Sequence, residues 1–306
     1  RYGLKVEPDD IMITNDAKQA LYSAMLDTGD PGQSMIIPSP AWASYGAQLK
    51  ACGLRPRFVP LDEKLHLDLS SIEKAIDETT TGIIVNSPNN PTGSVYTVEE
   101  LTGLVEIAIE HDVWLLSDEI YASMVWVDDR THTPVASLPG AANRTITIGG
   151  WSKGWAMTGW RLGWITGPPS LIDHVSVVQA NTVTHPPPFL QVGAAVALED
   201  ETLVEEIITP FSERRALVLR RLQAMPNIVV SGLEGAFYAF IDIRPTGLDD
   251  LEFVERLLSE ARVQAIPGSL MPFGEGWVRL SYTASTKDLI EGLDRMEAWL
   301  HTIHSS

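Results

Sequence analysis

Residues 145–164 contain the densest group of side chains that could do chemistry. The segment reads TITIGGWSKGWAMTGWRLGW and sets Ser152 beside Lys153, with Arg161 eight residues after the lysine. Its GWSKG portion matches G-x-S-x-G, the pattern of a hydrolase nucleophile elbow. The reactive group is therefore either the serine hydroxyl or the lysine amine, and these two groups belong to unrelated chemistries.

A hydrolase needs an acid and then a histidine downstream of Ser152, together with an oxyanion-hole segment. Acids and histidines do follow the serine, but no HGGG-like segment occurs, and the motifs NSPNNPTG and SDEIY are left without a role. A five-residue pattern with two glycines also arises often by chance, so we favour the lysine. The downstream acids and histidines are Asp173, Asp200, His174, His185, His301 and His304.

A lysine nucleophile must be neutral when it attacks a carbonyl, and burial or nearby cations lower its pKa. Its usual product is a Schiff base. The cofactor built on that linkage is pyridoxal 5′-phosphate, which also needs an acid at its pyridine nitrogen and a phosphate site. The planar guanidinium of Arg161 suits a phosphate. Asp118, in SDEIY, could hold the ring nitrogen protonated, and Trp42 offers a flat face for stacking.

Strands and helices must bring these side chains together. Apolar runs predict seven buried strands, and amphipathic stretches between them predict helices at 17–26, 69–78 and 98–111. Alternating strands and helices indicate an α/β domain with a mostly parallel central sheet flanked by helices. The predicted strands are 11–14, 34–38, 57–61, 82–86, 113–117, 145–149 and 163–167.

The pattern changes near Val192. A long helical region is followed by short strands and two further helices, which predicts a smaller C-terminal α+β domain. We expect the large domain over 1–208 and the small domain over 209–306. The elements predicted here are a helical region over 192–225, strands at 228–232, 235–243 and 276–282, a helix at 250–263 and a terminal helix from Lys287.

Ligands of open α/β sheets bind beyond the carboxyl ends of the strands. Five predicted strands are followed by polar or aromatic groups, so one ligand could use all of them. The helix that begins near Ala17 also offers free backbone N–H groups and a positive dipole end to an anion. The groups that follow the strands are Asn15–Lys18, Trp42, Asn90, Asp118 with Tyr121, and Lys153 with Arg161.

Five motifs together resemble one family. The segments SPAW, SPNNPTG, SDEIY, GWSKGWAMTGWRLGW and VRLSY, in this order and spacing, are similar to those of fold type I, class I/II pyridoxal-phosphate-dependent aminotransferases, and most of all to the aspartate aminotransferase branch. The resemblance covers nearly the whole chain. It implies transfer of an amino group from an L-amino acid to a 2-oxo acid with ping-pong kinetics, in a homodimer whose sites are completed across the interface.

The resemblance also implies roles at the cofactor ring. Lys153 would carry the Schiff base and move the substrate proton, while Asp118 would pair with the pyridine nitrogen. Asn90 and Tyr121 would bind the phenolic oxygen of the ring, and Trp42 would stack on it.

At the two ends of the ligand, further roles follow from the same resemblance. Arg279 of VRLSY would clamp the substrate α-carboxylate, with Asn90 and Trp42 on the same side. The phosphate would be held by Arg161, by Ser152 and by the backbone of Asp16, Ala17 and Lys18.

The sequence departs from the family pattern at three places. Asp16 stands where the family commonly has glycine, and a carboxylate near a phosphate is unfavourable unless it points away. Gly150 replaces a hydroxyl that some relatives use for the phosphate. The family's N-terminal segment, with a tyrosine that reaches the neighbouring subunit's phosphate, is expected to be missing from this chain.

Two other functions compete with an aminotransferase. A lyase or cyclase on the same fold needs the same Lys153, Asp118 and Arg279, so the residues barely separate it from the first hypothesis. A cofactor-free binding protein that kept the scaffold is the third hypothesis, and it predicts no bound chromophore.

Composition excludes several classes of partner. Forty acidic and 22 basic residues give a formal charge of −18, which repels nucleic acid and anionic membranes. Cys52 is the only cysteine, and without a secretion signal this indicates a reducing, cytoplasmic location. The seven histidines show no metal-ligand spacing, so no metal is expected. The one exception is His185, just before three prolines, because the family resemblance implies that this region lies near the substrate opening and the dimer partner.

Overall fold

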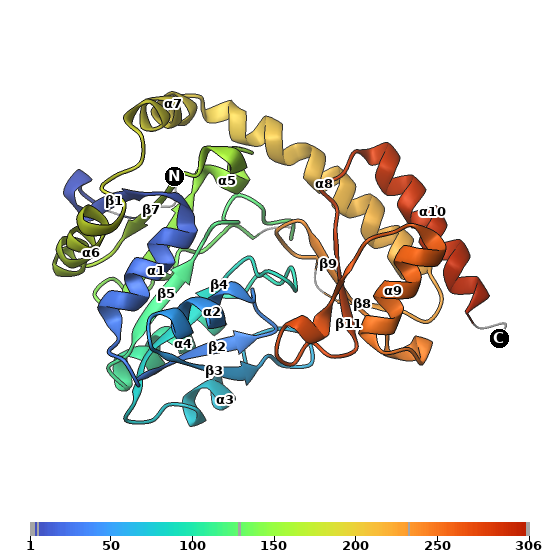
Figure 1. Cartoon of the computed structure of the whole chain (residues 1–306), viewed down its shortest axis with the longest axis horizontal. Coiled ribbons are helices and arrows are strands. Elements are labelled where there is room, and N and C mark those ends of the chain that lie inside the picture. The colour runs from blue at the N-terminus through green and yellow to red at the C-terminus, as the bar shows by residue number, and fades with distance from the viewer. Residues whose placement is uncertain (1–3, 5, 128–129, 232, 304–306) are drawn as a thin grey trace.

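The computed structural model describes residues 4, 6–127, 130–231 and 233–303. A seven-stranded sheet forms the larger part, with strand order β1-β7-β6-β5-β4-β2-β3 (Figure 1). Within it β7 pairs antiparallel with β6 and with β1, and the other four pairings are parallel. The predicted mostly parallel sheet is confirmed. The strands are β1 (Ile11–Thr14), β2 (Ser34–Ser39), β3 (Arg55–Pro60), β4 (Thr80–Asn86), β5 (Trp114–Asp118), β6 (Thr145–Gly150) and β7 (Gly163–Thr166).

Helices cover both faces of this sheet because its strands are apolar on both sides. On one face α1 (Asp16–Thr28), α2 (Ser44–Ala51) and α6 (Pro169–Thr182) pack on a core that includes Ile84, Ile148 and Ile165. On the other face α3 (Leu69–Lys74) and α4 (Val98–Glu110) pack on Ile83 and Leu115. The result is a three-layer α/β unit whose parallel strands end at one common edge.

Two of these helices are absent from the sequence prediction. In α2 the run SYGAQLKA contains a glycine and few apolar residues, so its periodicity is weak. In α6 the buried positions Leu171, Ile172, Val175 and Gln179 do follow a helical spacing. Pro169 at the first helical position marks its start, and that signal could have found it.

A second, four-stranded antiparallel sheet has the order β10-β11-β9-β8. The helices α8, α9 and α10 bury its apolar face, with Leu222, Phe253 and Met296 in the same core. Its elements are α7 (Pro188–Glu199), α8 (Glu201–Ala224), β8 (Val229–Ser231), β9 (Tyr238–Asp242), α9 (Asp250–Ala261), β10 (Ile266–Pro267), β11 (Trp277–Ser281) and α10 (Thr286–Thr302).

The predicted helical region over 192–225 is two helices rather than one. Asp200 separates them because its carboxylate accepts hydrogen bonds from the backbone N–H groups of Thr202 and Leu203, which caps α8. The predicted strand 228–232 includes Gly232, which lies outside the described residues. The expected domain boundary at 208/209 falls within α8, which spans the top of the molecule between the two sheets (Figure 1).

Short helical turns lie between the longer helices and strands. The helical turn α5 (Trp151–Gly154) follows β6, and single 3-10 turns occur at Pro8–Asp10, Val135–Ser137, Thr158–Trp160, Arg244–Thr246 and Gly268–Leu270. Tyr121, after β5, packs into the core of the second sheet beside Phe237 and Leu233, so this segment joins the two units.

Across the described residues no helix combines the length and apolar character that spanning a bilayer needs.

Candidate active site

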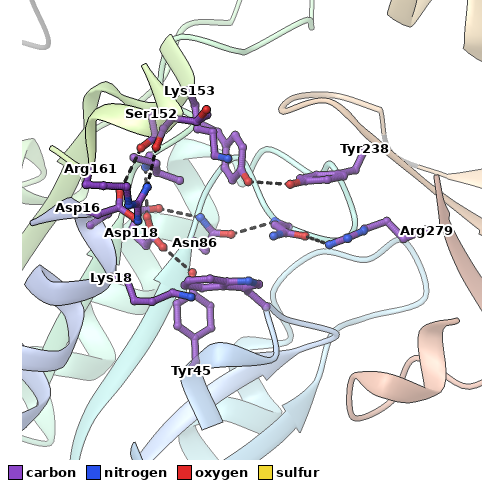
Figure 2. Close-up of a pocket in the computed structure, with 16 residues that line it drawn as sticks. Asp16, Lys18, Tyr45, Asn86, Asp118, Ser152, Lys153, Arg161, Tyr238 and Arg279 are labelled. Carbon is purple, nitrogen blue, oxygen red and sulfur yellow. Dashed lines mark hydrogen bonds and ion pairs between the residues drawn. The ribbon is translucent and has the colours of Figure 1, made fainter. Parts of the chain in front are cut away.

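A cavity of about 270 Å³ lies at the carboxyl ends of the parallel strands, where the second sheet faces the first (Figure 2). All eleven residues predicted for the site are in its lining, although they come from segments as far apart as 16 and 279. The lining consists of Asp16, Ala17, Lys18, Trp42, Tyr45, Asn86, Asn90, Asp118, Ile120, Tyr121, Ser152, Lys153, Thr158, Arg161, Tyr238 and Arg279.

Lys153 projects from the short turn α5, directly after β6. Its Nζ lies 5.5 Å from the ring centre of Phe237. Burial lowers the pKa of the Lys153 amine. The charge of Asp16 acts in the opposite direction and that of Arg161 in the same direction. The amine is therefore more easily neutral than an exposed lysine, as a nucleophile requires.

Asp118 is the last residue of β5 and its side chain is buried. Oδ2 accepts a 2.7 Å hydrogen bond from the Tyr45 hydroxyl, and Oδ1 accepts one of 3.2 Å from the backbone N–H of Ile120. Burial raises the pKa of Asp118 to about 6, while these two hydrogen bonds hold it down. Near neutral pH the carboxylate is thus mostly ionised and faces the cavity.

A chain of hydrogen bonds links the two sheets through two asparagines. Arg279 Nη1, on β11, donates to Asn90 Oδ1 at 2.8 Å. The Asn90 backbone N–H donates to Asn86 Oδ1, and Asn86 Nδ2 donates to the carbonyl of Asp118, both at 2.9 Å. Among the residues that the structure describes, the buried Arg279 Nε has no hydrogen-bond partner. This donor is available to an anionic ligand, since a buried polar group normally has a partner.

Tyr121 reaches the cavity from the loop after β5 and shares a 2.9 Å hydrogen bond with the hydroxyl of Tyr238 on β9. Burial raises the pKa of Tyr121 well above its ordinary value, so the phenol stays protonated. The guanidinium of Arg279 lies 4.7 Å from the ring centre of Tyr238. These contacts join the loop of the first unit to two strands of the second.

At the opposite end of the cavity, Arg161 and Ser152 meet at the start of α1. Ser152 Oγ donates to Asp16 Oδ1 at 3.0 Å, and Arg161 Nη2 forms an ion pair with Asp16 Oδ2. Arg161 Nη1 donates to the carbonyl of Thr158 at 2.7 Å. The Asp16 carboxylate therefore points towards these two donors and not away from them.

Glycine is needed where the β6–β7 hairpin passes α1. A Cβ on Gly163 would lie 2.3 Å from the backbone nitrogen of Ala17, so only glycine lets the helix start here. Asp16 itself has φ of 73°, in the left-handed region. The Thr14 hydroxyl donates to the Asp16 carbonyl at 3.0 Å and helps to fix that conformation.

Trp42 lines the cavity with its ring perpendicular to that of Tyr45, at a centre-to-centre distance of 5.4 Å. The Nζ of Lys18 lies 4.7 Å from the centre of the Trp42 ring. An aromatic face and an ammonium group therefore form one wall together, and both are able to contact a planar or anionic ligand.

Five lining residues were not predicted from the sequence. Asn86 ends the predicted strand 82–86, so the strand-end argument could have found it. Tyr45 follows Trp42 by three residues but sits inside the unpredicted α2. Tyr238 carried no signal in the sequence. Thr158 lies within GWSKGWAMTGWRLGW between Lys153 and Arg161, and Ile120 lies within SDEIY between two predicted residues.

The hydrolase hypothesis finds no support in the site. No histidine is among the lining side chains, and the Ser152 hydroxyl is bound to Asp16, so the hydrolase arrangement is not formed. His185 is exposed and its Nδ1 lies 2.9 Å from the Pro186 carbonyl, outside the cavity lining, and its expected place near the substrate opening stays a prediction. His304 lies outside the described residues. Within the described part of the chain no cluster of three potential metal ligands occurs.

Comparisons with known proteins agree with this geometry. A family model described as "Aminotransferase class I and II" matches residues 1–296. An aspartate aminotransferase of Pyrococcus abyssi is 40% identical over 302 residues, which cover 96% of this chain and 77% of that protein. Aromatic-amino-acid aminotransferase 2 of Thermococcus litoralis is 39% identical with the same coverage. The crystal structure of an aromatic aminotransferase from Pyrococcus horikoshii has a TM-score of 0.94 at 38% identity and covers 98% of this chain and 82% of that chain.

Proposed function

The chain belongs to the class I and II aminotransferase family, which generally uses pyridoxal phosphate, and on that premise we propose that it binds this cofactor through Lys153. The observation that carries the proposal is the placement of Lys153, Asp118 and Arg161 around one cavity. A half-buried amine with a lowered pKa, a buried carboxylate and a guanidinium beside a helix N-terminus are the groups that such a cofactor needs.

Pyridoxal phosphate supplies an aldehyde that captures amines and a ring that accepts electrons when its nitrogen is protonated. Asp118 would hold the proton on that nitrogen, because a buried carboxylate stabilises a neighbouring cation. Asn90 and Tyr121 would donate hydrogen bonds to the phenolic oxygen. Trp42 would stack on the ring, and Arg161 with Ser152 would hold the phosphate.

Lys153 would also move the substrate proton. Its Nζ, made easier to deprotonate by burial, would accept the proton from the substrate Cα and deliver it to C4′ of the cofactor. Arg279 would orient the substrate. Its buried Nε has no partner in the described structure, and its Nη1 already contacts Asn90. A substrate α-carboxylate could therefore accept hydrogen bonds from two nitrogens of the guanidinium, one of them Nε.

The donor amino acid is proposed from the similar proteins. Two of them are named aspartate and aromatic-amino-acid aminotransferases, so we propose these two classes of donor with 2-oxoglutarate as the first acceptor to test. The division into domains 1–208 and 209–306 and the cytoplasmic location remain predictions.

A homodimer is part of the proposal. Helix α7 presents an apolar surface on which Phe189 is 73%, Val192 66% and Val196 60% exposed. Large apolar side chains grouped on one exposed helix are typical of a protein interface. We propose that a second copy of the chain covers this surface.

The test is an absorbance spectrum of the purified protein with pyridoxal phosphate, before and after adding single amino acids. We expect a visible band that changes with a true donor and is missing in Lys153→Ala, while Lys50→Ala on the exposed side of α2 keeps it. With 2-oxoglutarate present, the donor's keto acid and glutamate should form together. Release of ammonia without glutamate would instead favour the lyase, and a protein that gains no band would reject the proposal.

A further inference from the structure

We propose that Asp16 sets how tightly the site holds the anionic end of its cofactor, because its carboxylate binds the donors that a phosphate would use. The inference rests on the proposed function in one respect, namely that the phosphate of the cofactor binds at the Arg161 end of the cavity. It concerns a residue to which the family resemblance gives only a backbone role.

The Asp16 carboxylate occupies the hydrogen-bond donors that an anionic ligand would use. Its two oxygens are shared between the Ser152 hydroxyl, at 3.0 Å, and the Arg161 guanidinium (Figure 2). These are the two lining side chains at this end that donate hydrogen bonds to it. A phosphate that arrives here must therefore displace the carboxylate from both, or share Arg161 with it.

The backbone that carries this carboxylate is held in place by its neighbours. Asp16 begins α1 in a left-handed conformation, its carbonyl accepts a hydrogen bond from Thr14, and Gly163 packs directly against it. These contacts oppose a shift of the helix start that would carry the side chain away. Aspartate also lies at the positive end of the helix dipole, which stabilises the negative charge in this place.

The charge of Asp16 then discriminates between ligands. A phosphate beside a carboxylate is repelled, and it competes for the same donors. A phosphate-free ligand such as pyridoxal has no charge at that end and meets no such repulsion. Asp16 should therefore weaken binding of pyridoxal phosphate while it leaves binding of pyridoxal almost unchanged.

The experiment compares equilibrium binding of pyridoxal phosphate and of pyridoxal to the cofactor-free protein. The variants are Asp16→Asn and, should that variant fold poorly, Asp16→Gly, which suits the left-handed backbone. The matched control is Asp242→Asn. Asp242 is 11% exposed and pairs with Arg244 at 2.6 Å outside the cavity, much as Asp16, 14% exposed, pairs with Arg161.

We expect Asp16→Asn to lower the dissociation constant for pyridoxal phosphate by at least about tenfold and that for pyridoxal by less than about twofold. The control should change neither. Equal affinities of the native protein and Asp16→Asn for pyridoxal phosphate would overturn the proposal. So would weaker binding by the variant, or an equal gain for both ligands.

Inorganic phosphate, measured by calorimetry on the same proteins, tests the anion site without the lysine. Binding to Asp16→Asn but not to the native protein would support the inference even if no Lys153-dependent band forms, in which case only the proposed function fails. Absence of phosphate binding in both proteins, or equal binding to both, would count against the role of Asp16.

Discussion

The hydroxyl of Tyr45 donates a 2.7 Å hydrogen bond to Oδ2 of Asp118, in the floor of the cavity. Both side chains are buried, with Tyr45 1% and Asp118 3% exposed. Burial and the charge of Asp118 raise the pKa of Tyr45 well above its ordinary value, so the phenol acts only as a donor. Tyr45 is thus a positioning residue that stabilises the ionised form of the carboxylate.

Replacing Tyr45 by phenylalanine should raise the pKa of Asp118 above about 6, since the hydrogen bond lowers that pKa. We expect the titration midpoint of the Asp118 carboxyl, followed by carbon NMR in the cofactor-free protein, to move upward by about one pH unit. The control is Tyr22→Phe, on the neighbouring helix α1, and it should leave the titration midpoint of Asp118 unchanged. An unchanged titration midpoint of Asp118 in Tyr45→Phe would show that the hydrogen bond does not lower the pKa of this carboxyl.

Asp118 should cost stability in the cofactor-free protein at neutral pH. Its folded-state pKa is about 6 against an ordinary value of 3.8, so its contribution to stability is full below about pH 4 and is lost as the pH rises through 6. Asp118→Asn removes this loss. Urea unfolding should show the variant gaining up to about 3 kcal/mol over the native chain at neutral pH and less at about pH 5. An equal difference at both pH values would contradict the assignment.

Arg279→Lys should impair substrate binding more than cofactor binding. A lysine cannot supply the Nε and Nη donors in one plane, so the two-point contact with a carboxylate is lost. We expect KM for the amino acid to rise by about a hundredfold, while the dissociation constant for pyridoxal phosphate changes little. Arg244→Lys, which lies outside the cavity, serves as the control. An unchanged KM would place the substrate carboxylate elsewhere.

His66 should stabilise the joint between the two units. Its Nδ1 lies 3.0 Å from Glu100 Oε2 on α4, and its Nε2 lies 3.4 Å from Glu234 Oε2, in the segment before β9. Glu234 also accepts a hydrogen bond from the Val95 backbone N–H at 3.0 Å. These two carboxylates raise the pKa of His66 to about 10.

Because the folded-state pKa of His66 exceeds the ordinary 6.5, its stabilisation is full below that value and is lost as the pH rises through about 10. His66→Gln should therefore lower the free energy of unfolding at about pH 7 and flatten its decline towards pH 10. The control is His174→Gln, because the His174 side chain is exposed and pairs with Asp27. If the variant keeps the native slope, another group titrates in that range.

Sequence reasoning located Lys153, Asp118 and Asn90 because all three follow buried strands, and the ends of parallel strands meet at one edge. The same logic could have reached Asn86. It could not reach Tyr238, which faces the cavity only because the second sheet packs against the first. A tertiary contact of this kind leaves no local pattern in the chain.

The orientation of Asp16 was likewise beyond the sequence. Its identity indicated a conflict with a phosphate, but the direction of the side chain depends on Arg161, 145 residues away, and on the close approach of Gly163. The fold was more accessible. The strands β1 and β6 begin at their predicted residues, whereas α2 was missed because too few of its apolar residues recur at helical spacing.

The reversed direction of β7 has an architectural consequence. Gly150 and Gly163 pair across β6 and β7, so the chain leaves the lysine and returns beside it within a single hairpin. The separation between the amine and the guanidinium is therefore governed by the number of residues in one connection, and not by how two remote pieces dock. A one-residue deletion between 154 and 160 would alter that spacing directly.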